Sequence, residues 1–139
     1  MAAAGATRFE AMEQLLRALA DPTRLRIVGL LLAGEVCVCH IHETLRIPQP
    51  KASRHLAYLK RARLVADRRN GLWVYYRLVE PADAVLRAIV DTIAHCCAAH
   101  VPIAERDRRR LERATGRCCT LRDRPAARPC CSGATGERL

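Results

Sequence analysis

A mainly α-helical fold with a single β-hairpin is predicted by three features of the sequence. Only 4% of the 139 residues are aromatic while 50% are hydrophobic, so the core has to be built from Leu, Ile, Val and Ala, which favours helices. Apolar residues recur every three or four positions in several segments, as they do along one face of an amphipathic helix. An Asn-Gly step at residues 70–71 separates two β-prone runs, residues 65–69 and 72–78, and is typical of a two-residue hairpin turn whose central positions need positive φ.

Capping and turn residues delimit the expected helices. The first, built on apolar residues 9–19, is followed by Asp21-Pro22, which provides an N-cap and a proline at the first position of the second helix. Gly34 ends that helix. The alternating run VCVCHI that follows could begin as a strand. Further helices are expected over residues 40–45, over residues 51–62 after a turn at 47–50, and from Pro81 onward, where Val85, Leu86, Ile89, Val90 and Ile93 form one apolar stripe.

The chain is expected to divide near residue 100. Residues 1–100 would form the folded domain, and residues 101–139 a charged helix with almost no apolar face, followed by a Cys-, Pro- and Arg-rich tail that we expect to be disordered. The N-terminus does not read as a signal peptide and no apolar run is long enough to span a membrane, so a cytoplasmic protein with no membrane partner is expected. In such a reducing compartment the eight cysteines are more typical of metal binding or redox chemistry than of structural disulfides.

The net charge of +10 is concentrated in one segment. Between Arg46 and Arg77 nine Lys or Arg stand against one acidic residue, Asp67, so this segment carries +8. A helix, a turn, a basic helix and a basic hairpin follow one another in the order of a winged helix-turn-helix, in which one helix enters the major groove of DNA and the hairpin lies beside it. A merely solvated basic face would explain the charge but not this order of elements. The residues expected to contact DNA are Gln49, Lys51, Ser53, Arg54 and His55 on the basic helix and Arg68, Arg69 and Asn70 on the hairpin. On the basic helix, Leu56 and Leu59 are expected to face the core. Its solvent-facing side chains are expected to be Lys51, Arg54, His55 and Lys60.

The same segment resembles the ArsR/SmtB family of metal-responsive repressors. The resemblance covers roughly residues 8–98 and rests on the runs DPTRLRIVGLL, EVCVCHI, PQPKASRHLAYLKRARLV and DRRNGLWVYYRL. It implies a dimer built on the first and last helices, binding to an inverted-repeat operator in double-stranded DNA, and release when an effector binds. The apolar surface of those two helices also predicts a symmetric homodimer.

Cys37 and Cys39 lie where arsenic-sensing members of that family carry Cys-Val-Cys, so the resemblance implies a metalloid site there. Trivalent arsenic and antimony are soft and prefer thiolate ligands, and a helix N-terminus lowers the pKa of a thiol. Because two sulfurs two residues apart reach one ion only from an extended backbone, we expect binding to distort the start of this helix. Many such sensors carry a third Cys three residues further on, and that position is His42 here.

Cys96 and Cys97, at the end of the last predicted helix, form a second candidate site. The pair resembles the C-terminal Cys-Cys of another group of arsenic-responsive family members. The alternative is that both pack at the dimer interface as small apolar side chains. Further potential ligands are His95, His100, Cys118, Cys119, Cys130 and Cys131.

The sequence thus predicts a transcriptional repressor that trivalent arsenic or antimony releases from its operator. An enzyme with a small-molecule substrate is not expected, because no nucleophile elbow, phosphate-binding loop, acid pair or thioredoxin-like CxxC is present. Two alternatives stay open. His42, His95 and His100 would suit a sensor of zinc, cadmium, cobalt or nickel, whereas the cysteines alone would suit a redox switch that needs no metal.

Overall fold

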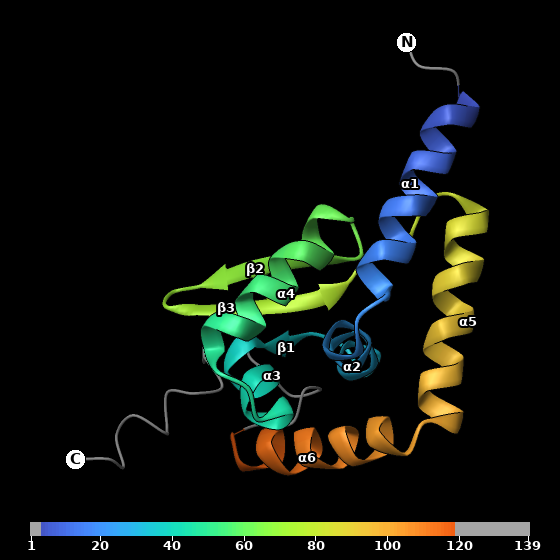
Figure 1. Ribbon diagram of the computed structural model, residues 1–139. Helices are drawn as coiled ribbons and strands as arrows, with labels where there is room; N and C mark the ends of the chain where they lie inside the picture. The colour runs from blue at the N-terminus through green and yellow to red at the C-terminus, as the bar shows by residue number, and fades with distance from the viewer. Residues whose placement is uncertain (1–3, 119–139) are drawn as a thin grey trace.

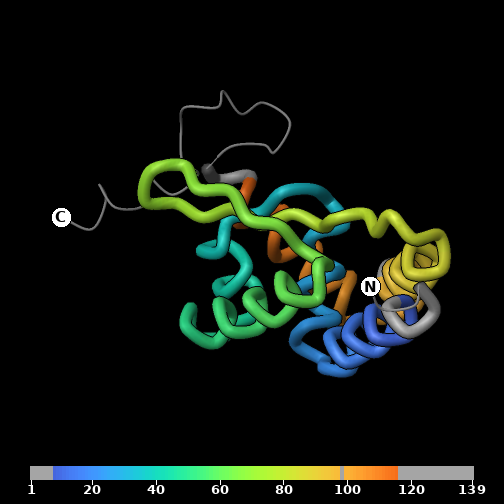
Figure 2. The backbone as a smooth tube through the Cα atoms, turned by 90° about the horizontal axis from the view of Figure 1, so that it is seen from above, coloured from blue at the N-terminus to red at the C-terminus, as the bar shows by residue number. Residues whose placement is uncertain are grey.

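The predicted mainly α-helical fold with a hairpin wing is confirmed by the computed structural model, which describes residues 4–118 of the chain, with side chains for residues 8–97 and 99–115 (Figure 1). The hairpin projects from the helices in two perpendicular views (Figures 1 and 2). In chain order the elements are α1 (Ala4–Leu19), α2 (Pro22–Leu31), β1 (Val36–Cys37), α3 (Val38–Leu45), α4 (Gln49–Arg61), β2 (Val65–Asn70), β3 (Trp73–Leu78), α5 (Ala84–His100) and α6 (Pro102–Cys118).

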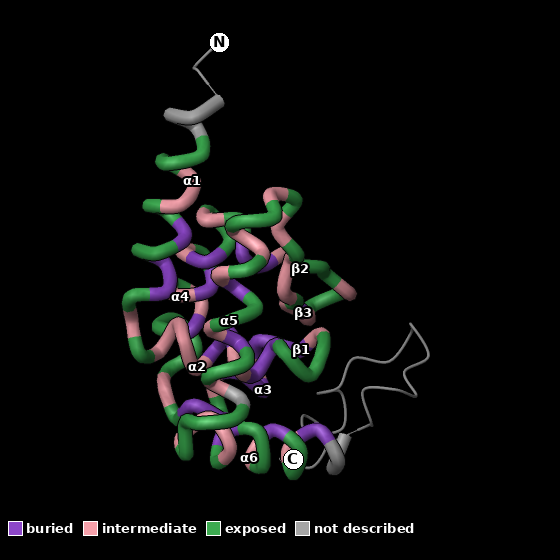
Figure 3. The backbone as a smooth tube through the Cα atoms, turned by 90° about the vertical axis from the view of Figure 1, so that its right-hand side faces the viewer, coloured by how far each residue is buried: buried purple, intermediate pink, exposed green. Residues whose placement is uncertain are grey.

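Helix α2 lies at the centre of the molecule. It contacts α1, α3, α4, α5 and α6, and Figure 1 shows it end-on among them. Ile27, Leu30 and Leu31 of α2 are buried, as are Leu56 and Leu59 of α4, which the sequence predicts to face inward. Figure 3 shows that the buried residues concentrate in the interior of the helical part, whereas the residues of the wing are mostly exposed or half-buried.

The wing differs from the prediction at its turn. Asn70 pairs with Trp73, which leaves Gly71 and Leu72 as the two loop residues. Of these only Gly71 has positive φ, at 62°, which is the requirement of a turn with glycine at its first central position. Asn70 is therefore the last residue of β2, and the expectation that it shares the turn is wrong.

A third strand completes the sheet, whose order is β1-β3-β2. Val36 and Cys37 pair antiparallel with Tyr76 and Tyr75 of the wing. The strand alternative for the VCVCHI run is thus confirmed for its first two residues. The helix of this region begins at Val38, two residues earlier than expected, and ends at Leu45.

Two other helix boundaries also differ from expectation. Helix α4 begins at Gln49, because Pro48 is the N-cap and Pro50 lies in the first turn, where its missing N–H removes no intrahelical bond. Helix α5 begins at Ala84 rather than at Pro81, since Asp83 caps it and Oδ1 of Asp83 accepts hydrogen bonds from the backbone of the first turn.

Helix α6 includes the predicted charged helix and lies across the base of the molecule. It follows α5 after a bend of 83° and contacts α2 and α3. The expectation of almost no apolar face misses its buried side, on which Leu111 and Thr115 are 2% and 6% exposed. The tail beyond residue 118 lies outside the described residues. Among those residues no single helix is long and apolar enough to cross a membrane, and α5 and α6 reach that length and composition only as a bent pair.

Candidate functional site

The N-terminal half of α4 presents a basic, solvent-facing surface. Gln49, Lys51 and Arg54 are exposed, as the sequence predicts, and Ser53 is half-buried. Lys51 and Arg54 make no ion pair with any residue that the structure describes. Both cations are therefore available to a polyanion such as the DNA backbone or to the acceptor edge of guanine.

His55 does not face the solvent as expected. Its side chain is 17% exposed and Nδ1 lies 3.8 Å from Oδ1 of Asp21, the N-cap of α2. Burial lowers the pKa of His55 below its usual value, although Asp21 acts in the opposite direction. His55 therefore belongs to the packing of α4 on α2, and it is a poor candidate for a base contact.

Arg24 is a positioning residue that the sequence analysis missed. Its guanidinium lies 4.1 Å from the centre of the Tyr58 ring on α4, and its Nε donates to the Ala18 carbonyl at 2.6 Å. A cation over an aromatic face is stabilising. One side chain thus ties the end of α1 to α2 and α4, and its position in the DPTRLR run was the available signal.

The three predicted wing residues have different surroundings. Arg69 is exposed and makes no ion pair among the described residues. Arg68 instead forms a forked ion pair with Glu35, and its guanidinium lies 4.8 Å from the centre of the Tyr75 ring. Arg68 is thus held against the root of the wing, while Arg69 is the freer cation. Asn70 is half-buried at the end of β2.

Cys37 and Cys39 converge at the start of α3. Cys37 is the N-cap, with extended backbone (φ −68°, ψ 142°), and the two Sγ atoms are 2.8 Å apart. The two sulfurs are already close in this conformation, because the extended backbone that their approach requires exists where β1 passes into α3. That ion binding distorts the start of the helix stays a prediction. Cys37 is 0% exposed, whereas Cys39 is half-buried. Cys39 is disulfide-bonded and Cys37 is not.

The sulfurs of Cys37 and Cys39 adjoin the wing as well as α3. Cys37 lies opposite Tyr75 on β3 and packs with it in a small buried cluster, against which Cys39 and Trp73 also pack. Since Arg68 stacks on the same Tyr75 ring, a change at the sulfurs reaches the wing through two side-chain contacts. It reaches the basic helix through the contact of α3 with α4.

His42 is not brought into the same cluster. The part of the chain that the structure describes holds no group of three or more His, Cys, Asp or Glu side chains arranged to bind a metal ion. His42 lies half-buried further along α3. Among the described residues the start of α3 therefore brings together the two cysteine sulfurs but not His42.

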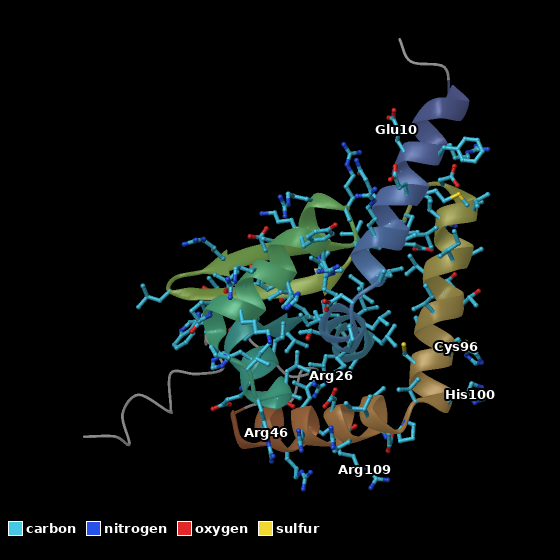
Figure 4. All side chains as sticks on the ribbon, in the orientation of Figure 1. Glu10, Arg26, Arg46, Cys96, His100 and Arg109 are labelled. Carbon is cyan, nitrogen blue, oxygen red and sulfur yellow. The ribbon has the colours of Figure 1, made fainter. Side chains whose placement is uncertain are left out.

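Cys96 and Cys97 lie near the far end of α5, away from α3 (Figure 4). Cys96 is exposed and Cys97 is half-buried. Burial raises the pKa of Cys97, and the neighbouring Cys96 raises it further, which disfavours the thiolate that a metal requires. The rings of His95 and His100 approach edge to face at 6.5 Å between centroids.

Taken together, a basic helix docked on α2 and a three-stranded sheet that ends in a wing define a winged helix-turn-helix regulatory protein, with two cysteine sulfurs at the junction of the helices and the sheet. Residues 21–67 match the family model described as bacterial regulatory protein, arsR family. The chain belongs to the ArsR/SmtB family of regulators.

Relatives with curated names support this placement. The chain is 48% identical over 84 residues to the arsenical resistance operon repressor of Escherichia coli, covering 60% of this chain and 72% of that protein. It is 48% identical over 80 residues to the arsenic resistance transcriptional regulator ArsR1 of Pseudomonas putida, covering 54% of this chain and 62% of the relative's length. It is also 40% identical over 87 residues to the repressor SmtB of Mycobacterium tuberculosis, covering 63% of each chain.

Solved structures of similar fold include other regulators. The transcriptional repressor BigR of Xylella fastidiosa matches with a TM-score of 0.57 at 30% identity, covering 68% of this chain and 91% of that one. The homodimeric winged helix-turn-helix domain of Mb0332 from Mycobacterium bovis matches with a TM-score of 0.58 at 31% identity, covering 73% of this chain and 94% of that one. These relatives are regulators, and none of them is named as an enzyme.

Proposed function

We propose that this protein is a dimeric transcriptional repressor that binds operator DNA through α4 and the wing and leaves it when trivalent arsenic or antimony binds Cys37 and Cys39. The DNA-binding half of the proposal is supported by the exposed cations Lys51, Arg54 and Arg69, which form no ion pair within the described part of the chain. Half or more of the hydrogen bonds in protein–DNA complexes go to the sugar-phosphate backbone of the DNA, and basic side chains of this kind donate them.

Dimerisation is supported by apolar side chains left exposed on α1 and α5. Phe9 and Leu16 are 75% and 48% exposed, and Val85 of α5 is 44% exposed. The two helices lie side by side at one edge of the molecule (Figures 1 and 2), and Nε of Arg8 lies 3.0 Å from Oδ2 of Asp83 between them. One self-complementary surface of this kind generates a two-fold dimer.

The single observation that carries the effector assignment is the 2.8 Å separation of the Cys37 and Cys39 sulfurs at the N-terminus of α3. Thiolates are the ligands that soft metalloids prefer, and a helix N-terminus favours the ionised thiol. Two of the curated relatives are named for arsenic or arsenical resistance. Because this site contacts both the wing and, through α3, the basic helix, occupying it biases the two DNA-contacting elements together.

A thiol redox switch is the second candidate, and the disulfide at Cys39 favours it. In this alternative, oxidation at Cys39 rather than metalloid binding changes the start of α3. No metal is needed, and reduction restores the initial state.

A titration of operator-bound protein distinguishes these candidates. The reduced protein is held on fluorescent operator DNA, and arsenite, antimonite, zinc and hydrogen peroxide are added separately while anisotropy is followed. We expect release by arsenite and antimonite. Release by peroxide alone would support the redox switch, and release by zinc alone would support a divalent-metal sensor.

A further inference from the structure

Helix α6 brings an arginine to the turn of the helix-turn-helix. This turn, residues 46–48, joins α3 to α4, and Arg46 at its start is exposed. Nη1 of Arg110 on α6 donates a hydrogen bond to the carbonyl oxygen of Thr44, at 3.5 Å and two residues before Arg46. Figure 4 shows Arg46 where the end of α3 meets α6. Two guanidinium groups, those of Arg46 and Arg110, therefore lie at the junction of α3, α4 and α6.

The packing of α6 fixes the position of Arg110. The Asp107 carboxylate of α6 is 1% exposed and accepts hydrogen bonds from Nε and Nη2 of Arg26 on α2, at 2.7 and 2.9 Å. Leu111, the residue after Arg110, joins the main core, and α6 contacts both α2 and α3. Arg110 itself is half-buried. The helix therefore holds Arg110 at the turn from a packed support.

The two guanidinium groups carry positive charge that the folded chain does not pair. Arg46 and Arg110 form no ion pair within the part of the chain that the structure describes, and the Asp107 carboxylate is occupied by Arg26. Partial burial, and after it the charge of Arg46, lowers the pKa of Arg110. Like charges at short range are mutually unfavourable. An anion bound between Arg46 and Arg110 would relieve this repulsion.

We propose that Arg46 and Arg110 together bind one phosphate of the DNA backbone, so that α6 extends the DNA-contacting surface beyond α4 and the wing. The inference rests on the DNA-binding half of the function proposed above. Arg46 lies three residues before Gln49, the first residue of α4, so the pair adjoins the surface already assigned to DNA. A guanidinium has five N–H donors, and the one bond to Thr44 leaves Arg110 with donors for phosphate oxygens.

A purely structural role for Arg110 is the alternative. A cation at the C-terminus of α3 binds its last carbonyl groups and interacts favourably with the helix dipole, which requires no DNA. That role predicts a loss of stability in Arg110→Ala but no change in the salt dependence of DNA binding. Arg46→Gly separates the two roles. Arg46 has a φ of 57°, which glycine adopts without steric cost, so this variant removes a guanidinium and keeps the backbone of the turn.

The test measures binding of the full-length chain to duplex DNA at several salt concentrations. Fluorescence anisotropy is recorded with an operator duplex and with a duplex of random sequence. The variants are Arg46→Gly, Arg110→Ala and the combination of both. The matched control is Arg113→Ala, which removes an exposed arginine without an ion pair elsewhere on α6. Urea denaturation shows which variants are folded, and Arg46→Gly decides the question if Arg110→Ala is not.

We expect Arg46→Gly and Arg110→Ala each to weaken binding by about 10-fold on both duplexes, because a phosphate contact carries no sequence information. The double variant should lose little more than either single variant, since both side chains hold the same phosphate. Its slope of log K against log salt concentration should fall in magnitude by about 1 for each subunit bound. Arg113→Ala should change the affinity much less.

Three results would overturn the proposal: unchanged affinity in Arg46→Gly, equal losses in Arg110→Ala and Arg113→Ala, or losses that multiply in the double variant. The last would mean that Arg46 and Arg110 act at separate places. Failure of the proposed function has a different signature. The native protein would then bind the operator duplex no more tightly than the duplex of random sequence, whatever the variants do.

Discussion

Arg26 of α2 and Asp107 of α6, which are 81 residues apart in sequence, form a two-pronged ion pair with N···O distances of 2.7 and 2.9 Å. Figure 4 shows Arg26 between the two helices. The carboxylate is almost completely buried, and its hydrogen bond raises the pKa of the Arg26 guanidinium. This pair fixes the highly charged α6 to the central helix, so the last described helix is part of the folded unit.

Breaking the pair should destabilise the protein strongly. Asp107→Ala leaves the partly buried Arg26 charge uncompensated, and we expect the free energy of unfolding to fall by about 3 kcal/mol. The matched control is Glu112→Ala, which removes an exposed partner of Arg108 on the same helix and should cost less than about 1 kcal/mol. Urea denaturation of both variants measures the difference, and similar small losses would show that α6 contributes little to folding.

Substitution of Arg54 should weaken operator binding. Arg54 is exposed on α4 with no ion-pair partner among the residues described, so Arg54→Ala should cost about 1–3 kcal/mol at the specific site. Arg106→Ala on α6 removes the same charge away from α4 and should change the affinity by much less. Fluorescence anisotropy with operator DNA makes the comparison; equal losses in the two variants would mean that only net charge matters.

The stability of the fold should depend on pH through His55. Burial lowers the pKa of His55 below 6.5, so at mildly acid pH the unfolded chain binds more protons than the folded one. Stability conferred by the neutral ring is therefore complete above about pH 6.5 and is lost as the pH falls toward the folded-state pKa. We expect an NMR titration midpoint below 6.5 for His55 and a weaker acid-side loss of stability in His55→Gln. A midpoint above 6.5 would show that Asp21 dominates.

Assembly should depend on the exposed apolar residues of α1. Leu16→Glu places a charge on the surface shared by α1 and α5, and we expect it to shift the protein from dimer to monomer in sedimentation velocity. Leu72→Glu is the matched control, because Leu72 is 94% exposed at the tip of the wing. A native protein that sediments as a monomer at micromolar concentration would contradict the dimer outright.

Local signals predicted most of the winged fold. The N-cap Asp21, the apolar spacing of Leu56 and Leu59 and the hairpin on either side of Gly71 each act within a few residues, and the structure confirms them. β1 was harder to assign because a two-residue strand has no periodicity of its own. It exists only because Tyr75 and Tyr76, far along the chain, supply its hydrogen-bond partners.

The parts that sequence reasoning missed depend on distant partners. The inward side of α6 is defined by Asp107 and Leu111, whose burial is possible only because Arg26 and the core accept them. His55 occupies a position with the spacing of a solvent-facing residue, yet Asp21 draws it inward. The prediction that Cys37 and Cys39 form a site remains a proposal, but their convergence follows from local backbone geometry, since the strand ends where the helix begins.

The central claim is that metalloid binding at the start of α3 releases DNA, and an arsenite titration of operator-bound cysteine variants tests it most directly. Fluorescence anisotropy should show release of the native protein and of Cys96→Ser at similar arsenite concentrations, and no release of Cys37→Ser. His42→Ala should respond like the native protein, because sulfur dominates the binding of trivalent arsenic. Release of Cys37→Ser by arsenite together with retention of Cys96→Ser on DNA would place the sensing site on α5 and contradict the account.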